Sequence, residues 1–336
     1  QGLLEAVQRN PGVRGLAANP LLLTILALMK RQGVTLPERR VELYDQYVRT
    51  LLSSWNRARG LDRPPKRDLD VVETVRILAP LALWMHQVSP GAGLVKRGDV
   101  ERKLQAIYAG RGEDDPEQMA RRFLADVREY AGLLLERGAG QYGFIHLTFE
   151  EYLAAVGVAR RGQREIAPIV EALSEHVRES DWREVALLTV GYLGIVQQWE
   201  EVASDVVHAL LARRPGEPGQ AAVLMGDAVV DAWPGGVTPE CKGRVVQALL
   251  EAMADDRRVQ PAQRAAAGDT LAQLGDPRSG VGLRADGLPD IAWCEVPGGT
   301  FFMGEGNHRI DLPTFWVARY PITNAQYAAF VEDGGY

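Results

Sequence analysis

The stretch from residue 130 to 161 constrains the fold of this chain more than any other. Gly132 to Glu136 has the composition of a short strand, Arg137 to Gly140 that of a glycine-containing turn, and Gln141 to His146 that of a returning strand. Thr148-Phe149-Glu150-Glu151 then has the pattern of a capping box, which starts a helix that runs to about Arg160. A β-hairpin set between helices predicts a winged-helix domain.

Amphipathic helices are expected before this hairpin. Two short ones fall within residues 1–32, and the second opens at Asn19-Pro20, because proline is tolerated in a first helical turn. The capping-box pattern Thr35-Leu36-Pro37-Glu38 starts the next helix, whose apolar residues recur at three- and four-residue spacing as far as Trp55. Three more helices are expected, at about 71–86 with a kink at Pro80, at 99–109 and at 117–128.

The second half of the chain changes pattern at a linker. From Glu165 to about Leu274 roughly six amphipathic helices follow one another, which in pairs fit a short α-solenoid. Gly275 to Pro289 is rich in Gly, Pro and Asp and is interpreted as a linker. Strands are then expected at 292–296, 300–303 and 311–317, followed by a capped helix from Thr323. The predicted class is therefore mainly α, with an α/β module beginning at the C-terminal side.

Composition excludes several classes of protein. The chain has 336 residues, 46% of them hydrophobic, which is enough apolar material for two or three domain cores. The net charge of -6 and the lack of a long Lys/Arg run argue against nucleic acid as a partner. No apolar stretch reaches the roughly 20 residues that cross a bilayer.

Cys241 and Cys294 lie far apart with no metal-ligand spacing, so we expect no metal site and a reducing, cytoplasmic setting. Gln1 and Tyr336 both read as cuts within a longer protein.

Two of the N-terminal passages resemble one known family, the NACHT-type STAND NTPases. The first passage consists of Asn19–Thr24 (NPLLLT) followed by 36–44 (LPERRVELY), and it is similar to the helical and winged-helix segments of that family. The second passage is Phe144–Ala155 (FIHLTFEEYLAA), which resembles the family's Phe-x-His-x-x-Phe-Gln-Glu-Tyr-x-Ala-Ala element. Glu150 stands where the family usually has Gln.

A third passage resembles a different family. Trp293 to Gly304 and Arg319 to Tyr336 are similar to the start of the formylglycine-generating, or sulfatase-modifying, enzymes, which have a C-type-lectin-like fold. The resemblances imply five parts: the end of a NACHT helical domain (1–34), a winged-helix domain (35–162), HEAT-like helical repeats (163–278), a linker (279–289) and the N-terminal part of a formylglycine-generating-enzyme-like domain (290–336).

His146 is the first candidate site residue. It stands before the expected helix start, where free backbone N–H groups and the helix dipole favour an anion. The resemblance implies that this histidine contacts the β-phosphate of bound ADP and holds the protein closed. The alternative is a core histidine that is hydrogen-bonded to a backbone carbonyl.

Three further residues complete the candidate site. Pro20 has a flat apolar face, and the resemblance implies that it packs on the adenine; the alternative is an ordinary helix-start proline. Thr148 and Glu151 are expected to support the site by capping the helix whose start faces the phosphate.

Two motifs that an enzyme would need are missing from the sequence. No Gly-x-x-x-x-Gly-Lys-Ser/Thr phosphate loop occurs, so ATP hydrolysis is not expected of this chain. The catalytic cysteine pair of formylglycine-generating enzymes does not occur either, and Cys294, in a first strand, does not fill that role.

The resemblance implies the regulatory and sensor region of a bacterial STAND NTPase, an oligomerising ADP/ATP switch in defence or signalling. ADP or ATP with Mg²⁺ would be bound mainly by a separate NACHT domain, and a protein or peptide ligand would be sensed at the C-terminal module. We expect a homo-oligomer on activation and neither a nucleic-acid nor a membrane partner. Two alternatives stay open: a formylglycine-generating oxidoreductase or ligand-binding lectin-like protein with a helical scaffold, and a passive scaffold.

Overall fold

The computed structural model describes residues 20–31, 37, 39–58, 70–127, 133–138, 140–214, 216–305 and 308–335. The chain divides into two compact units, with the division between Thr270 and Leu271. Among the described residues, none of the helices combines the length and the apolar character that crossing a bilayer requires. Each unit is mainly built from the elements that the hydrophobic patterns predict.

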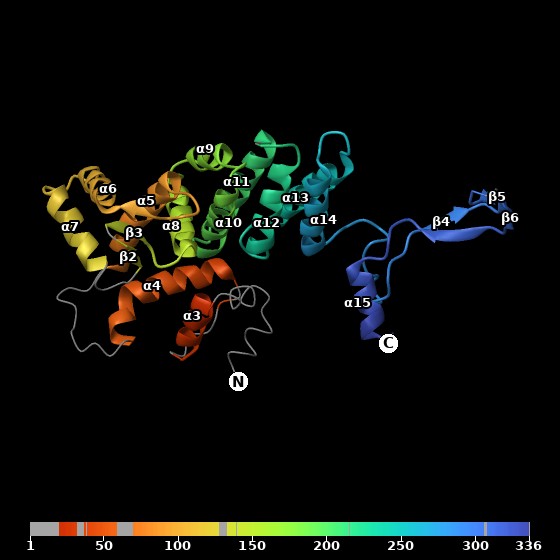
Figure 1. Ribbon diagram of the computed structural model, residues 1–336, viewed down its shortest axis with the longest axis horizontal. Coiled ribbons are helices and arrows are strands. Elements are labelled where there is room, and N and C mark those ends of the chain that lie inside the picture. The colour runs from red at the N-terminus through yellow and green to blue at the C-terminus, as the bar shows by residue number, and fades with distance from the viewer. Residues whose placement is uncertain are drawn as a thin grey trace. The chain divides into compact units, whose positions relative to one another are not determined.

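The first part of unit 1 is a winged helix (Figure 1). A three-stranded antiparallel sheet in the order β1-β3-β2 forms the wing, with Val95 opposite Tyr142 and Leu134 opposite Phe144. Helix α3 (Pro20–Arg31) precedes the winged helix, whose elements are α4 (Arg40–Ala58), α5 (Val71–Val88), β1 (Val95–Lys96), α6 (Arg97–Ala109), α7 (Pro116–Asp126), β2 (Leu134–Glu136), β3 (Gln141–Phe144) and α8 (Leu147–Arg160).

Helices α5 and α8 form the centre of this winged helix. They can approach closely because Gly157 has no side chain: a Cβ there would lie 2.7 Å from the carbonyl oxygen of Ala79. Phe149 is fully buried on α8 and stacks on Tyr47 of α4, with ring centroids 4.7 Å apart. The Tyr152 hydroxyl donates to Asp45 of α4 over 2.8 Å. Helix α8 is therefore held on two sides, which fixes the position of its first residues.

The rest of unit 1 is an array of helices that continues from α8, as the amphipathic pattern predicts. Trp182 is buried there and stacks on His176 with ring centroids 3.7 Å apart. The elements are α9 (Ala167–Glu175), a 3₁₀ turn η2 (Ser180–Trp182), α10 (Arg183–Gly191), a π-helical turn η3 (Tyr192–Val196), α11 (Glu200–Arg213), α12 (Gln220–Ala232), α13 (Pro239–Ala254) and α14 (Pro261–Leu274).

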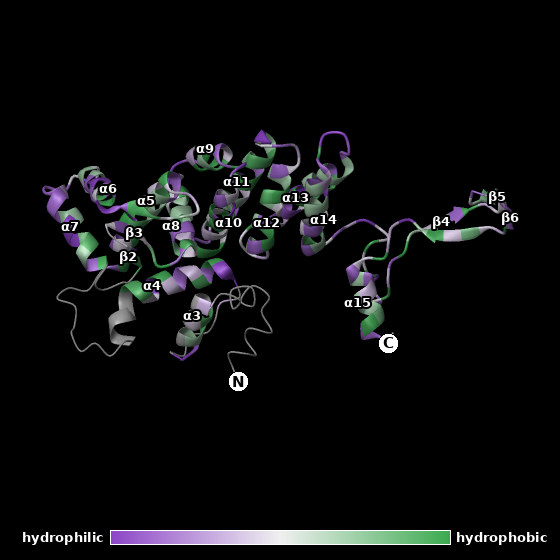
Figure 2. Ribbon diagram, in the orientation of Figure 1, coloured by the Kyte–Doolittle hydropathy of each residue, from purple (hydrophilic) through white to green (hydrophobic). Residues whose placement is uncertain are grey.

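Unit 2 holds two strand pairs and one helix. Strand β4 (Trp293–Val296) pairs with β7 (Phe315–Ala318), and β5 (Gly299–Met303) pairs with β6 (His308–Leu312), both antiparallel. Helix α15 (Asn324–Glu332) begins with the expected capping box, in which Thr323 and Gln326 cap each other's backbone. Large apolar side chains stay exposed on the strands, including Trp293, Phe302 and Trp316, and Figure 2 shows hydrophobic residues in the β4–β7 pair.

The structure corrects four expectations about elements. Residues 311–317 do not form one strand: Pro313 lacks the N–H that a ladder needs, and the segment divides into β6 and β7. No strand was expected between the helices at about 71–86 and 99–109, where the third wing strand β1 lies. Helix α4 begins at Arg40, later than a cap at Thr35 implies; Thr35, Leu36 and Glu38 themselves lie outside the described residues. The first hairpin strand begins later than expected, at Leu134, and the second ends earlier than expected, at Phe144.

Candidate functional site

His146 lies where the wing ends and α8 begins. The Ile145 N–H donates to the carbonyl of Leu133 over 2.7 Å, which keeps the chain extended up to this point. His146 itself has extended dihedrals (φ -150°, ψ 146°) and is the N-cap of α8: its Nδ1 accepts from the backbone N–H of Thr148 over 3.2 Å. The imidazole is half-buried at the helix start.

This capping geometry determines where the imidazole proton lies. An Nδ1 that accepts a hydrogen bond has no proton, so a neutral ring holds its proton on Nε2. Burial lowers the pKa of His146, and the positive charge of Arg137 lowers it further. At neutral pH the residue is therefore a neutral ring with an Nε2–H donor. The ring is thus a hydrogen-bond donor that carries no charge.

Arg137 was missed in the sequence, where the turn drew attention only to its glycines. Its guanidinium donates to the carbonyl of Ile145, the residue before His146. A cation and an N–H donor thus lie beside the first turn of α8, and both favour an anion. The signal available in the sequence was an arginine that directly follows strand β2.

Thr148 is not the N-cap, which corrects the expected capping box. It is the second residue of α8, and its Oγ1 lies 3.0 Å from Nδ1 of His146. Thr148 therefore contacts the imidazole and does not itself cap the helix. The capping-box partner role of Glu151 falls with it, because Glu151 lies one turn further into the helix.

Glu151 is half-buried and lies near two other carboxylates, those of Glu150 and Glu184. Burial, together with the like charges of Glu184 and Glu150, raises its pKa to about 7, while His86 and Arg40 act in the opposite direction. A carboxyl group with this pKa changes its charge near physiological pH.

We expect Glu151→Gln to stabilise the chain above pH 7 and to change little at pH 5. The pKa in the folded chain lies above the ordinary glutamate value of 4.5, so the folded chain binds the extra proton and its stability falls as pH rises between these two values. The difference in the free energy of unfolding at pH 8 should be about 3 kcal/mol. Thermal unfolding of both proteins from pH 5 to 8.5 measures it, and parallel curves would contradict the shifted pKa.

A buried acid–base pair lies just behind the site. His86 of α5 and Glu150 are both fully buried, and their Nδ1 and Oε1 atoms are 3.3 Å apart. The other nitrogen, Nε2, faces the backbone carbonyl of Asp181 at 3.2 Å, so it must hold a proton. Burial raises the pKa of Glu150 against the opposing effect of His86. The pair thus joins α5 and α8 to η2.

Pro20 is the first residue of α3, as expected, and is exposed. Its carbonyl accepts from the Thr24 hydroxyl over 2.8 Å. Within the described parts of the chain, no hydrogen bond or ion pair joins Pro20 to His146. The two candidate contacts to a nucleotide therefore come from separate elements.

A charge network joins the winged helix to the helical array. Arg40, at the start of α4, binds Glu184 of α10 over 2.5 Å, and its Nε donates to Asp231 of α12 over 2.7 Å. Burial would lower the pKa of Arg40, but the two carboxylates raise it well above its usual value. Arg39 adds a bond to the Asp231 carbonyl over 3.2 Å. None of these contacts is local in the sequence.

No group of three or more His, Cys, Asp or Glu side chains that could hold a metal ion occurs in the described residues. Cys241 is buried, and burial raises its pKa to about 11, so its thiol is protonated at neutral pH. Cys294 is exposed on β4.

Comparison with known proteins identifies both resembled parts. Residues 40–158 match the family model for a winged helix-turn-helix domain C-terminal to NACHT, and residues 290–336 match that of the sulfatase-modifying factor enzyme 1-like domain. A hercynine oxygenase from Mycolicibacterium smegmatis is 36% identical over 73 residues, which is 17% of this chain and 17% of that protein. The resemblance to a NACHT-associated winged helix joined to a sulfatase-modifying-factor segment is confirmed.

Proposed function

We propose that this chain, which carries a NACHT-associated winged helix and a sulfatase-modifying-factor-like segment, is the regulatory and sensor region of a bacterial STAND NTPase. The switch would be controlled by ADP and ATP, would assemble into a homo-oligomer and would act in defence or signalling. The observation that carries the proposal is His146, whose Nε2–H donor lies beside the first turn of α8.

The nucleotide would bridge two parts of the protein. A NACHT domain holds ADP or ATP with Mg²⁺, His146 donates to the β-phosphate, and Pro20 packs on the adenine. These contacts favour the closed state only if they are stronger there than in the open state, by a few kcal/mol. Thr148 supports the donor through its contact with the imidazole.

The proposed domains follow the patterns of the sequence: 1–34 as the end of a helical domain, 35–162 as winged helix, 163–278 as HEAT-like repeats, 279–289 as linker and 290–336 as the lectin-like part. The Arg40 network would make the winged helix and the repeats move as one body. A movement of α8 would then be transmitted to the repeats.

The sensor would be the C-terminal module, and its ligand a protein or peptide. The support is the exposed apolar surface of unit 2, where Trp293 and Phe302 are 61% and 65% exposed. Contiguous exposed apolar side chains are characteristic of interaction surfaces. We place the protein in the cytoplasm, with neither nucleic acid nor a membrane as partner.

The test is the response of the intact protein to nucleotide. With ADP it should elute from size exclusion as a monomer, and with a non-hydrolysable ATP analogue plus ligand as an oligomer. This chain alone should hydrolyse no ATP, because it has no phosphate loop. Elution that does not depend on nucleotide would favour a passive scaffold and would overturn the proposal.

A second candidate is an oxidoreductase of the formylglycine-generating type. The matches to the sulfatase-modifying factor domain and to hercynine oxygenase favour it. Oxidation of a cysteine-containing peptide by the intact protein, with oxygen consumption as the readout, separates this candidate from the switch.

A further inference from the structure

A basic hollow opens on the winged helix between α5, α6 and the end of α8. Its volume is about 680 Å³, within the range of small-ligand sites. Pro80, Leu83 and Gly157 contribute to its apolar wall. The cationic and aromatic side chains that line this basic hollow are Arg76, Trp84, Lys103, Arg111, Arg160 and Arg161.

The charges of the basic hollow are not balanced. Among the described residues that line it, five are cationic and none carries a carboxylate. Glu73, beside it, binds Arg76 over 2.7 Å and Arg111 over 2.6 Å. One carboxylate thus serves two guanidinium groups, and an excess of positive charge remains.

Lys103 and Arg161 carry most of this excess. In the described part of the chain, neither has a carboxylate within ion-pair distance, and the Lys103 ammonium lies 5.9 Å from the ring centroid of Trp84. Burial lowers the pKa of Lys103, and the like charge of Arg161 lowers it further. Two like charges thus lie near each other, with Lys103 half-buried and Arg161 exposed, an arrangement that an anion would stabilise.

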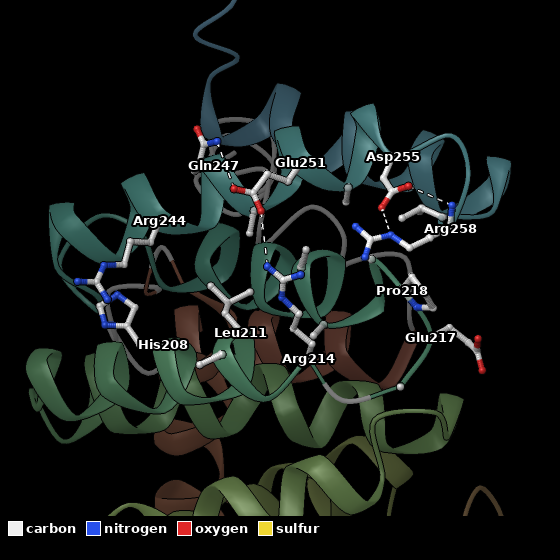
Figure 3. A pocket seen from close by; sticks show the side chains of 18 residues that line it. His208, Leu211, Arg214, Glu217, Pro218, Arg244, Gln247, Glu251, Asp255 and Arg258 are labelled. Carbon is white, nitrogen blue, oxygen red and sulfur yellow. Dashed lines mark hydrogen bonds and ion pairs between the residues drawn. The ribbon is translucent and has the colours of Figure 1, made fainter.

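A second large pocket of unit 1 differs from the basic hollow in its charge balance (Figure 3). It lies among α11, α12 and α13, and each of its three arginines faces a carboxylate: Arg214 pairs with Glu251, Arg244 with Glu240 and Arg258 with Asp255. Its charges are balanced within the protein, so it has no comparable need for an anion. The charge imbalance therefore distinguishes the basic hollow from this second pocket.

The wall of the basic hollow is rigid. The close approach of α5 and α8 at Gly157 forms it, with Leu83 Cβ 3.1 Å from where a Cβ of residue 157 would lie. Packed helices place this wall before a ligand arrives, which lowers the cost of ordering it on binding.

We propose that the basic hollow binds a small phosphate-bearing ligand, either a pyrophosphate-like anion or a nucleotide. Lys103 and Arg161 would bind the phosphates, since both present N–H donors and uncompensated charge. Trp84 offers a flat aromatic surface to a base. The hollow lies at the C-terminal end of α8 and His146 at its N-terminal end, roughly 20 Å apart along 14 residues. The inference therefore does not rest on the proposed nucleotide switch.

Calorimetry with the full 336-residue chain tests the proposal, with pyrophosphate, ADP and adenosine as separate probes. We expect pyrophosphate and ADP to bind with Kd below about 1 mM and adenosine not to bind in that range. The double variant Lys103→Glu/Arg161→Glu should weaken both phosphate ligands roughly 10-fold or more. Trp84→Leu should weaken ADP more than pyrophosphate if the base is also bound, and both equally if only phosphate is recognised.

Arg213→Glu/Arg257→Glu is the matched control, because it makes the same change in net charge at two exposed arginines outside the basic hollow. Folding of each variant is checked by circular dichroism. No binding at about 5 mM ligand, an equal loss in the control, or an oligonucleotide that displaces both ligands would overturn the proposal.

Discussion

Arg40→Met should lower the free energy of unfolding by about 2 kcal/mol. The methionine keeps most of the packing volume but leaves Glu184 and Asp231 without their shared cation. A fully buried pair costs more when it is broken, but Arg40, Asp231 and Glu184 keep 21%, 27% and 31% of their side-chain surface exposed. Chemical denaturation measured against wild type gives the value.

Arg49→Met is the matched control on the same helix. Its ion pair with Asp45 is local, four residues apart, and its side chain is 51% exposed, so the loss should be below about 1 kcal/mol. Limited proteolysis adds a second readout, because only the Arg40 variant should expose cleavage sites between the winged helix and α10. Equal losses in both variants would mean that the Arg40 network does not join these parts.

His146→Leu in the intact protein should speed ADP release about 10- to 100-fold, which corresponds to a lost donor to phosphate worth about 1.5–3 kcal/mol. The loss falls on the closed, ADP-bound state, so the protein should assemble without its ligand. Leucine also removes the N-cap of α8, which should cost about 1 kcal/mol of stability. Stopped-flow release of a fluorescent ADP analogue and size exclusion at saturating ADP measure the two effects.

His146→Asn separates the donor from the cap. The asparagine side-chain oxygen can accept from the Thr148 N–H as Nδ1 does, so the helix start is kept while the Nε2–H donor is lost. The Asn variant should therefore release ADP as fast as the Leu variant but unfold like wild type. Unchanged ADP release in both variants, with stability lost only in the Leu variant, would make His146 a structural residue.

Local patterns determined which elements form and where the site lies along the chain. The hairpin of β2 and β3, helix α8 after it and the Thr323–Gln326 cap were all predicted, because turn residues, apolar periodicity and caps act within a few residues. The role of His146 and Pro20 at a nucleotide stays a prediction from resemblance.

The tertiary structure decided what those side chains do. His146 and not Thr148 caps α8, because the Ile145–Leu133 hydrogen bond holds the chain extended to the residue before it. The pKa of Glu151 depends on Glu184 of another helix, and Arg40 meets Asp231 across 191 residues of sequence. The basic hollow likewise brings together cations from α5, α6 and α8 and from the turns that follow α6 and α8. Such pairings depend on how helices pack, and no periodicity within one segment encodes which residue of a distant helix will face it.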